Sequence, residues 1–236
     1  MTESLLFKEN QNFQTFGLQH MLAILAFVVF GFLLIHWSKK LSKSNQYKIG
    51  NIFGFSLSVA VIVWTIIKIY FNGFNIQQDL PFHLCNFTAL LIPIFTLTRK
   101  KIYYEILLFW ILAGTTQAIL TPDLKNGFPH FNFLKYWFVH AGLIVFVFYA
   151  THIYKMRPTL RSVFKSFFAL QGYFILMLIV NKLTNANYFY ISKKPKGPTL
   201  LDFLGEWPYY ILIVELFLIP YFLLIYLPFY LTRNKK

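Results

Sequence analysis

Seven apolar runs divide this 236-residue chain, and each is near the roughly 20 residues that a helix needs to cross the hydrocarbon of a bilayer. Hydrophobic residues make up 57% of the chain and charged residues only 13%, a balance that a soluble domain could not cover with polar surface. The sequence therefore predicts an all-α polytopic membrane protein, with one domain of seven transmembrane helices over residues 1–236. The runs are Leu18 to Trp37, Asn51 to Phe71, Phe82 to Leu97, Ile102 to Leu120, Phe133 to Thr151, Val163 to Leu183 and Tyr209 to Leu231.

The net charge of +14 could suggest a nucleic-acid partner, but the placement of the charges indicates a membrane orientation instead. Basic residues gather in alternate loops, as the positive-inside rule expects of cytoplasmic loops. This pattern predicts an outer N-terminus and a cytoplasmic C-terminus, in a multi-pass protein of the plasma membrane that binds no nucleic acid. The basic groups are Lys39, Lys40, Lys43 and Lys48; Arg99, Lys100 and Lys101; Lys155, Arg157, Arg161 and Lys165; and Arg233, Lys235 and Lys236.

The only cysteine, Cys85, lies two residues after His83 at the start of the third run. A thiol near an imidazole is a candidate nucleophile, because only the thiolate attacks and an imidazole partner favours the thiolate. On a regular helix, residues two apart point about 200° apart, so His83 and Cys85 could not easily touch. We therefore expect the base to come from another helix. His140, at a similar depth in the fifth run, is the expected base, and His83 would orient the site or a lipid head group.

Polar side chains in the outer half of the predicted bundle form a second pattern. Such groups are costly in hydrocarbon and usually face a cavity or one another. Six of the predicted helices contribute such side chains at a similar depth in the outer leaflet. We therefore expect a single pocket that binds the substrate. Besides Lys68 at the end of the second run, the residues expected there are His20, His83, Cys85, Asn86, Gln117, His140, Asn181 and Glu215.

Each of these residues also has a purely structural interpretation. Cys85 could be a small buried hydrophobe, His140 could hydrogen-bond across helices, and His20 could be an interfacial residue. For Glu215 we expect a structural ion pair with Lys68 or Lys135 in preference to a catalytic role.

Four short segments occur in an order that resembles the YwaF-like bacterial membrane proteins, the family that includes the transmembrane-protein-164 acyltransferase. His83-Leu84-Cys85 resembles the family's His-Leu-Cys segment, and Trp137 to Gly142, with His140 inside it, resembles its second histidine segment. Asn185-Ala186-Asn187-Tyr188 is similar to its Asn-rich outer loop, and Trp207-Pro208-Tyr209-Tyr210 to its entry into the last helix. The seven-helix count is also that of the family.

The resemblance implies fatty-acyl transfer between membrane phospholipids and lysophospholipids, with Cys85 as the nucleophile and His140 as its partner, and with no cofactor or metal. It adds Asn187 and Tyr188 to the expected substrate-binding residues. In this mechanism His140 takes the thiol proton and the thiolate attacks an ester carbonyl, so that the acyl group waits as a thioester for a lysolipid hydroxyl. His83, Asn86 or Gln117 would donate to the oxyanion. If water attacks the thioester instead, the protein is a phospholipase.

Two other classes of function stay open. A metal-dependent membrane lipid hydrolase would use His20, His83, Cys85, His140 and Glu215 as zinc ligands, although no closely spaced pair such as His-x3-His supports it. A transporter or receptor would bind a ligand in the outer pocket. Against transport, the polar groups are concentrated in the outer half of the predicted bundle.

Overall fold

The computed structural model describes residues 6–10, 12–195, 197 and 199–232, and every regular element within them is a helix. In chain order they are α1 (Leu18–Ser38), α2 (Lys43–Asn72), α3 (Leu84–Thr98), α4 (Lys101–Trp110), η1 (Ile111–Thr115), α5 (Thr116–Leu120), α6 (Phe131–His152), α7 (Leu160–Thr184), η2 (Tyr188–Tyr190), η3 (Leu200–Leu204) and α8 (Tyr209–Leu231).

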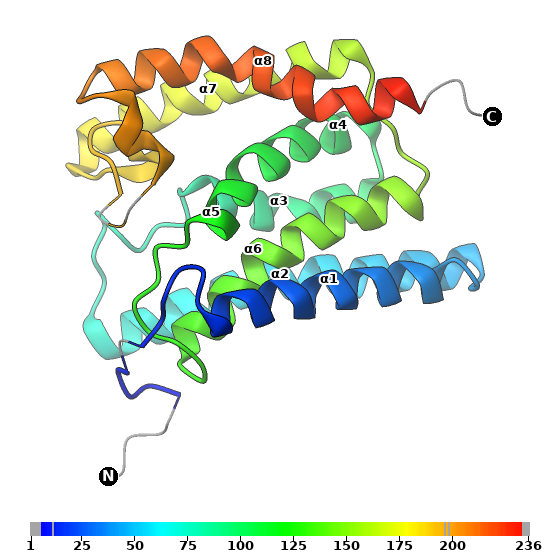
Figure 1. The fold of residues 1–236 in the computed structure, drawn as a ribbon, viewed down its shortest axis with the longest axis horizontal. Helices are drawn as coiled ribbons and strands as arrows, with labels where there is room; N and C mark the ends of the chain where they lie inside the picture. Colours follow the sequence, from blue (N-terminus) through cyan, green and yellow to red (C-terminus); the bar gives the residue numbers. More distant parts are fainter. Residues whose placement is uncertain (1–5, 11, 196, 198, 233–236) are drawn as a thin grey trace.

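The long helices run along one axis in three levels (Figure 1). Helices α1, α2 and α6 lie at one side of the bundle, α3, α4 and α5 lie in the middle, and α7 and α8 lie at the other side. Helix α2 packs against α3 and α6, α4 packs against α7, and α7 packs against α8. Because α6 also contacts α1, α3, α4 and α5, it is central, and residues near its start face the interior of the bundle.

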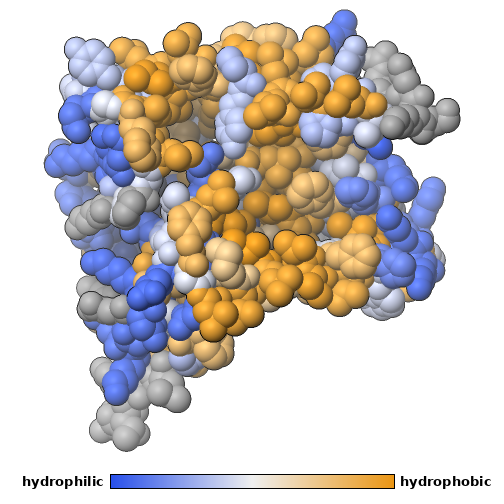
Figure 2. Space-filling view, in the orientation of Figure 1, coloured by the Kyte–Doolittle hydropathy of each residue, from blue (hydrophilic) through white to orange (hydrophobic). Residues whose placement is uncertain are grey.

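Six helical segments of the described residues are long and apolar enough to cross a membrane. They are α1, Lys43–Phe71 of α2, the continuous segment Lys101–Leu120, α6, α7 and α8. Figure 2 shows a broad apolar band over the middle of the molecule, with hydrophilic residues towards both ends of the helices. The all-helical membrane class is therefore confirmed. The seven crossings and the orientation of the termini stay predictions, and residues 233–236, which include three of the basic residues used for that orientation, lie outside the described residues.

The third predicted span is a shorter helix than the apolar run suggested. Helix α3 has 15 residues and begins at Leu84, whereas the run begins at Phe82. His83 precedes the helix with extended backbone angles, φ −71° and ψ 138°. The angular separation expected for two residues on a regular helix therefore does not apply to His83 and Cys85.

The start of α2 and the interruption of the fourth helical segment depend on local interactions that hydrophobicity alone does not predict. Helix α2 begins at Lys43 and not at Asn51, because the Ser42 side chain accepts a hydrogen bond from the Asn45 N–H and caps a polar first turn. The fourth run is interrupted by a π-helical turn, Ile111–Thr115, a feature that is frequent at functional sites. Gly114 in this turn allows close approach to α3, since a Cβ there would lie 3.2 Å from Leu84 Cδ2.

We predict that close packing between α2, α3 and α6 makes Gly54 sensitive to a single added methyl group. A Cβ at Gly54 would lie 2.8 Å from Ile92 Cγ2 and 3.1 Å from Phe146 Cε2, both in the core. Overpacking of this kind costs about 1–3 kcal/mol, so Gly54→Ala should lower the melting temperature of the purified protein. Gly172→Ala in α7 is the matched control, because nothing lies within 4 Å of its Cβ position. It should leave the melting temperature unchanged or raise it, and equal destabilisation by both variants would contradict the packing described here.

Candidate functional site

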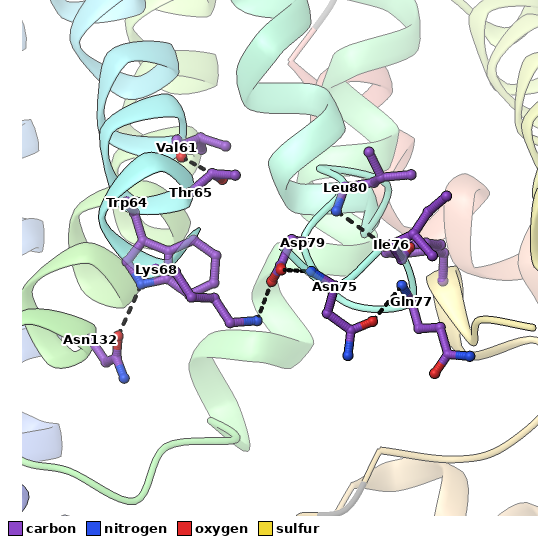
Figure 3. Close-up of polar contacts among 11 residues, drawn as sticks. Val61, Trp64, Thr65, Lys68, Asn75, Ile76, Gln77, Asp79, Leu80 and Asn132 are labelled. Atoms are coloured by element: carbon purple, nitrogen blue, oxygen red, sulfur yellow. Dashed lines mark hydrogen bonds and ion pairs between the residues drawn. The ribbon is translucent and has the colours of Figure 1, made fainter. Parts of the chain in front are cut away.

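The connection between α2 and α3, residues 73–83, leads directly to Cys85 and is held by an ion pair. Lys68 Nζ near the end of α2 lies 2.5 Å from Asp79 Oδ1, and the side chain of Asp79 is 1% exposed. The Asn75 N–H donates to the other carboxylate oxygen at 2.6 Å. Figure 3 shows Lys68 reaching from α2 to Asp79 in the connection. The pair therefore fixes the approach of the chain to α3.

Burial of the Asp79 carboxylate raises its pKa, but the Lys68 ammonium and the Asn75 N–H favour the charged form more strongly. The net result is a pKa of Asp79 below its ordinary value. The carboxylate is therefore charged throughout the neutral and mildly acidic range, and the ion pair is present there.

The loop between α7 and α8 also holds this connection, through hydrogen bonds. The buried Tyr188 hydroxyl donates to Ile76 O at 2.6 Å and accepts from the Leu80 N–H at 3.1 Å. Asn181 in turn holds both backbone groups of Tyr188, at 2.9 and 2.8 Å. Asn181 and Tyr188, both predicted to bind substrate, thus contact the chain itself and support the segment before Cys85. Asn187 likewise accepts from Ser192 N–H and Lys193 N–H and shapes the loop.

His83 lies between this loop and the start of α3. Its ring centroid is 4.8 Å from that of Tyr190 and 5.5 Å from that of Tyr188. Its Nδ1 atom is buried and, within the described residues, has no hydrogen-bond partner. A buried nitrogen without a partner is unusual in a folded protein, so His83 has an unused position for a hydrogen bond to a ligand.

Cys85 occupies the first turn of α3 and is half-buried. Its Sγ lies 3.6 Å from the hydroxyl of Thr115, the last residue of the π-helical turn. Thr115 is 1% exposed, so its hydroxyl is fixed in position. The π-helical turn therefore supplies the side chain that contacts the only thiol of the protein, a link that no sequence pattern indicated.

His140 is held in a defined tautomer on α6. Its Nδ1 lies 2.8 Å from Tyr136 O, and a carbonyl oxygen only accepts, so Nδ1 carries the hydrogen. In the neutral ring, Nε2 is then the acceptor that a general base needs. The Tyr136 ring stacks on His140 with centroids 4.1 Å apart, and its hydroxyl donates to Ala118 O at 2.7 Å. These contacts fix the orientation of the imidazole.

Lys135, near the start of α6, connects this helix with the start of α3. Its Nζ donates to Asn86 Oδ1 at 3.2 Å and lies 4.2 Å from the centre of the Trp64 ring. Through this contact, α6, which also carries His140, reaches the first turn of α3, where Cys85 lies. The sequence contained a signal for Lys135, since a lysine inside an apolar run usually serves a function, but it was considered there only as a partner of Glu215.

The predicted ion pair of Glu215 with Lys68 or Lys135 is wrong. Glu215 accepts a hydrogen bond from Gln171 at 2.7 Å, while Lys68 pairs with Asp79 and Lys135 with Asn86. Glu215 thus contacts the amide of Gln171 on the adjacent helix α7 in place of a lysine.

Two other predicted pocket residues have partners away from Cys85. Gln117 donates to the Tyr221 hydroxyl of α8 at 3.3 Å, and its Oε1 atom is buried without a partner in the described part of the chain. His20 is fully buried. It accepts from the Phe16 N–H through Nδ1 and so donates to Ile119 O through Nε2, which joins the start of α1 to α5.

The residues considered as zinc ligands do not gather in one place. Among the described residues no group of three His, Cys, Asp or Glu side chains could hold a metal ion. His20 is hydrogen-bonded to Ile119 O, and Glu215 is hydrogen-bonded to the Gln171 side chain.

The fold and the site define a polytopic helical membrane protein with a cysteine in the first turn of a short apolar helix and a histidine just before that helix. The chain belongs to the TMEM164 family, whose pattern matches residues 15–226. It is also similar to an uncharacterized protein of Treponema pallidum (strain Nichols), with 26% identity over 177 residues that cover 70% of this chain and 68% of that protein. No solved structure matches it. The resemblance based on four short segments is therefore confirmed at the level of the TMEM164 family.

We predict that Asp79→Asn destabilises the protein in a pH-dependent way. Because the folded pKa of Asp79 is lowered, its contribution to stability is complete above the ordinary carboxyl pKa of about 4 and is lost as the pH falls through the folded pKa. The melting temperature of the variant should lie below that of the wild type by a constant amount between pH 8 and pH 5, and the difference should shrink below about pH 4.

Glu206→Gln is the matched control for that measurement. It removes the Lys194–Glu206 pair at 3.5 Å, in which the Glu206 side chain is 91% exposed, and exposed pairs contribute little. A melting temperature of Asp79→Asn equal to that of the wild type at pH 7 would contradict the role of the ion pair.

Proposed function

We propose that this protein is a membrane phospholipid acyltransferase that moves a fatty acyl chain from a phospholipid to a lysophospholipid through a thioester on Cys85. The observation that carries the proposal is the contact of Lys135 in α6 with Asn86, which brings the helix of His140 to the first turn of α3, where Cys85 lies, with His140 Nε2 as the acceptor of its ring. Membership of the TMEM164 family supports it, because the sequence resemblance to that family implies acyl transfer.

The first half of the proposed reaction forms the thioester. His140 Nε2 takes the proton from Cys85 Sγ, and the thiolate attacks the carbonyl carbon of the donor ester. The carbon–oxygen bond of the ester then breaks, and the leaving lysolipid oxygen takes the proton from His140. The structure shows no hydrogen bond between Cys85 and His140 among the described residues. In this proposal they approach one another when substrate is bound, since catalytic hydrogen bonds often tighten only in the complex.

The second half returns the enzyme to its starting state. The hydroxyl of the acceptor lysophospholipid gives its proton to His140 Nε2, and its oxygen attacks the thioester carbonyl. The carbon–sulfur bond breaks, and the thiolate regains the proton from His140. One ester is exchanged for another, so the reaction needs no oxidant and no activated acyl carrier.

Asn86 and His83 are the proposed donors to the oxyanion that forms in both halves. Lys135 Nζ is a donor only, so it fixes Asn86 Oδ1 as an acceptor and leaves the Asn86 NH2 group free to donate. His83 Nδ1 is buried without a partner in the described part of the chain. A donor placed where charge develops contributes about 100- to 1,000-fold to the rate. Gln117, whose amide donates to Tyr221, is less suited to this role than Asn86.

We predict that purified protein in phospholipid vesicles converts an isotope-labelled lysophospholipid into labelled diacyl phospholipid, which mass spectrometry of the lipids detects. Cys85→Ala should remove this activity, because no other thiol exists in the chain. His140→Ala should lower it by about 100- to 10,000-fold, the usual contribution of general acid–base catalysis.

His152→Ala provides a matched control on the same helix. His152 Nδ1 bonds Phe148 O at 2.9 Å, the same contact that His140 makes with Tyr136 O, but at the other end of α6. It should keep wild-type activity. An undiminished rate in folded Cys85→Ala would refute the thiol mechanism. Release of free fatty acid in place of diacyl product would show a lipase.

A further inference from the structure

An apolar groove of about 470 Å³ lies between α1, α2 and α6, a volume within the usual range for small-molecule sites. Small side chains leave room for it, since Ala23 and Ala26 of α1 and Ala60 of α2 are among the residues that line it. The groove lies along the first two turns of α6, at the level where α6 presents Lys135 to the site of Cys85.

Of the residues that the structure describes, Lys135 is the one charged residue that lines this groove. Its ammonium group contacts Asn86 and the Trp64 ring, and within the described residues it makes no ion pair with a carboxylate. By contrast, Lys68, which also faces Trp64, is paired with Asp79. A cation in an apolar bundle without a counter-ion is costly, so the structure has a place for an anion at Lys135.

We propose that the groove holds one acyl chain of a glycerophospholipid whose phosphate pairs with Lys135. The apolar walls suit a hydrocarbon chain, and the single cation at one wall suits the one anionic group that such a lipid carries next to its chains. Because Lys135 contacts Asn86, the neighbour of Cys85, a phosphate there brings the glycerol esters to the thiol. This inference rests on the proposed function for the identity of the lipid as the acyl donor.

The test measures lipid binding by a variant that cannot carry out the proposed transfer reaction. Cys85→Ala protein in nanodiscs is irradiated with a phosphatidylcholine that carries a diazirine in one acyl chain, and labelled peptides are mapped by mass spectrometry. Label is expected in residues 23–27, 60–63 and 134–138. A diacylglycerol with the same diazirine chain serves as the probe without phosphate.

Substitutions separate the phosphate contact from the groove. Lys135→Gln should lower labelling by phosphatidylcholine by about 10- to 100-fold, the value of a hydrogen bond to a charged group, and leave labelling by diacylglycerol unchanged. Lys135→Arg should restore labelling by phosphatidylcholine. Ala26→Trp should fill the groove and remove labelling by both probes, whereas Leu25→Trp, on the exposed face of α1, should not.

The outcomes distinguish this proposal from the proposed function. Groove labelling that depends on Lys135, in a protein without transfer activity, would support the lipid site and reject the acyltransferase. Transfer activity with label outside the three segments, or with label insensitive to Lys135→Gln, would overturn the lipid site alone. In active protein, Lys135→Gln should raise the KM for phospholipid donor. A fall in kcat alone would mean that Lys135 acts on the Cys85 thiolate, and would also overturn the proposal.

Discussion

The position of Cys85 depends on the hydrogen bonds made by the non-helical connection 73–83, because this connection precedes α3, a helix too short to cross the membrane. Fifteen residues of α3 extend about 22 Å at about 1.5 Å per residue, whereas the hydrocarbon of a bilayer is about 30 Å thick. In the proposed topology the helix ends beside the cytoplasmic basic loop, so its start lies below the outer boundary. Non-helical backbone at such depth is tolerated only where protein groups pair with it.

Several protein groups form hydrogen bonds with the connection 73–83. Tyr188 bonds the backbone of Ile76 and Leu80, Tyr173 donates to Phe82 O at 2.5 Å, and Asp79 accepts from the Asn75 N–H. Among the buried side-chain atoms of this connection, Nδ1 of His83, two residues before Cys85, is left with neither a hydrogen bond nor an ion pair. In the proposed topology the thiol lies below the membrane surface and away from bulk water, which supports the proposed transfer of the acyl group to a lipid over its hydrolysis.

Sequence patterns predicted the apolar elements well because hydrophobic length is a local property. All seven runs are helical except at Phe82 and His83 of the third run, and the ends of α1, α6 and α8 agree with the runs to within two residues. The polar contacts could not be predicted, because they depend on which helices are neighbours. Glu215 bonds Gln171 instead of a lysine, and Thr115 reaches Cys85 only through a π-helical turn. Asn181 was selected as a polar outer residue and Tyr188 through the family resemblance; in the structure Asn181 bonds the backbone of Tyr188, and the Tyr188 ring contacts that of His83.

The central claim is a covalent acyl group on Cys85, and the mass of the intact protein tests it most directly. Protein incubated with phospholipid and no lysophospholipid should gain the mass of one acyl chain. Neutral hydroxylamine should remove that mass, added lysophospholipid should discharge it into diacyl lipid, and Cys85→Ala should never acquire it. Wild-type protein that transfers acyl chains at full rate without passing through such an adduct, or that carries the adduct on another residue, would contradict the account.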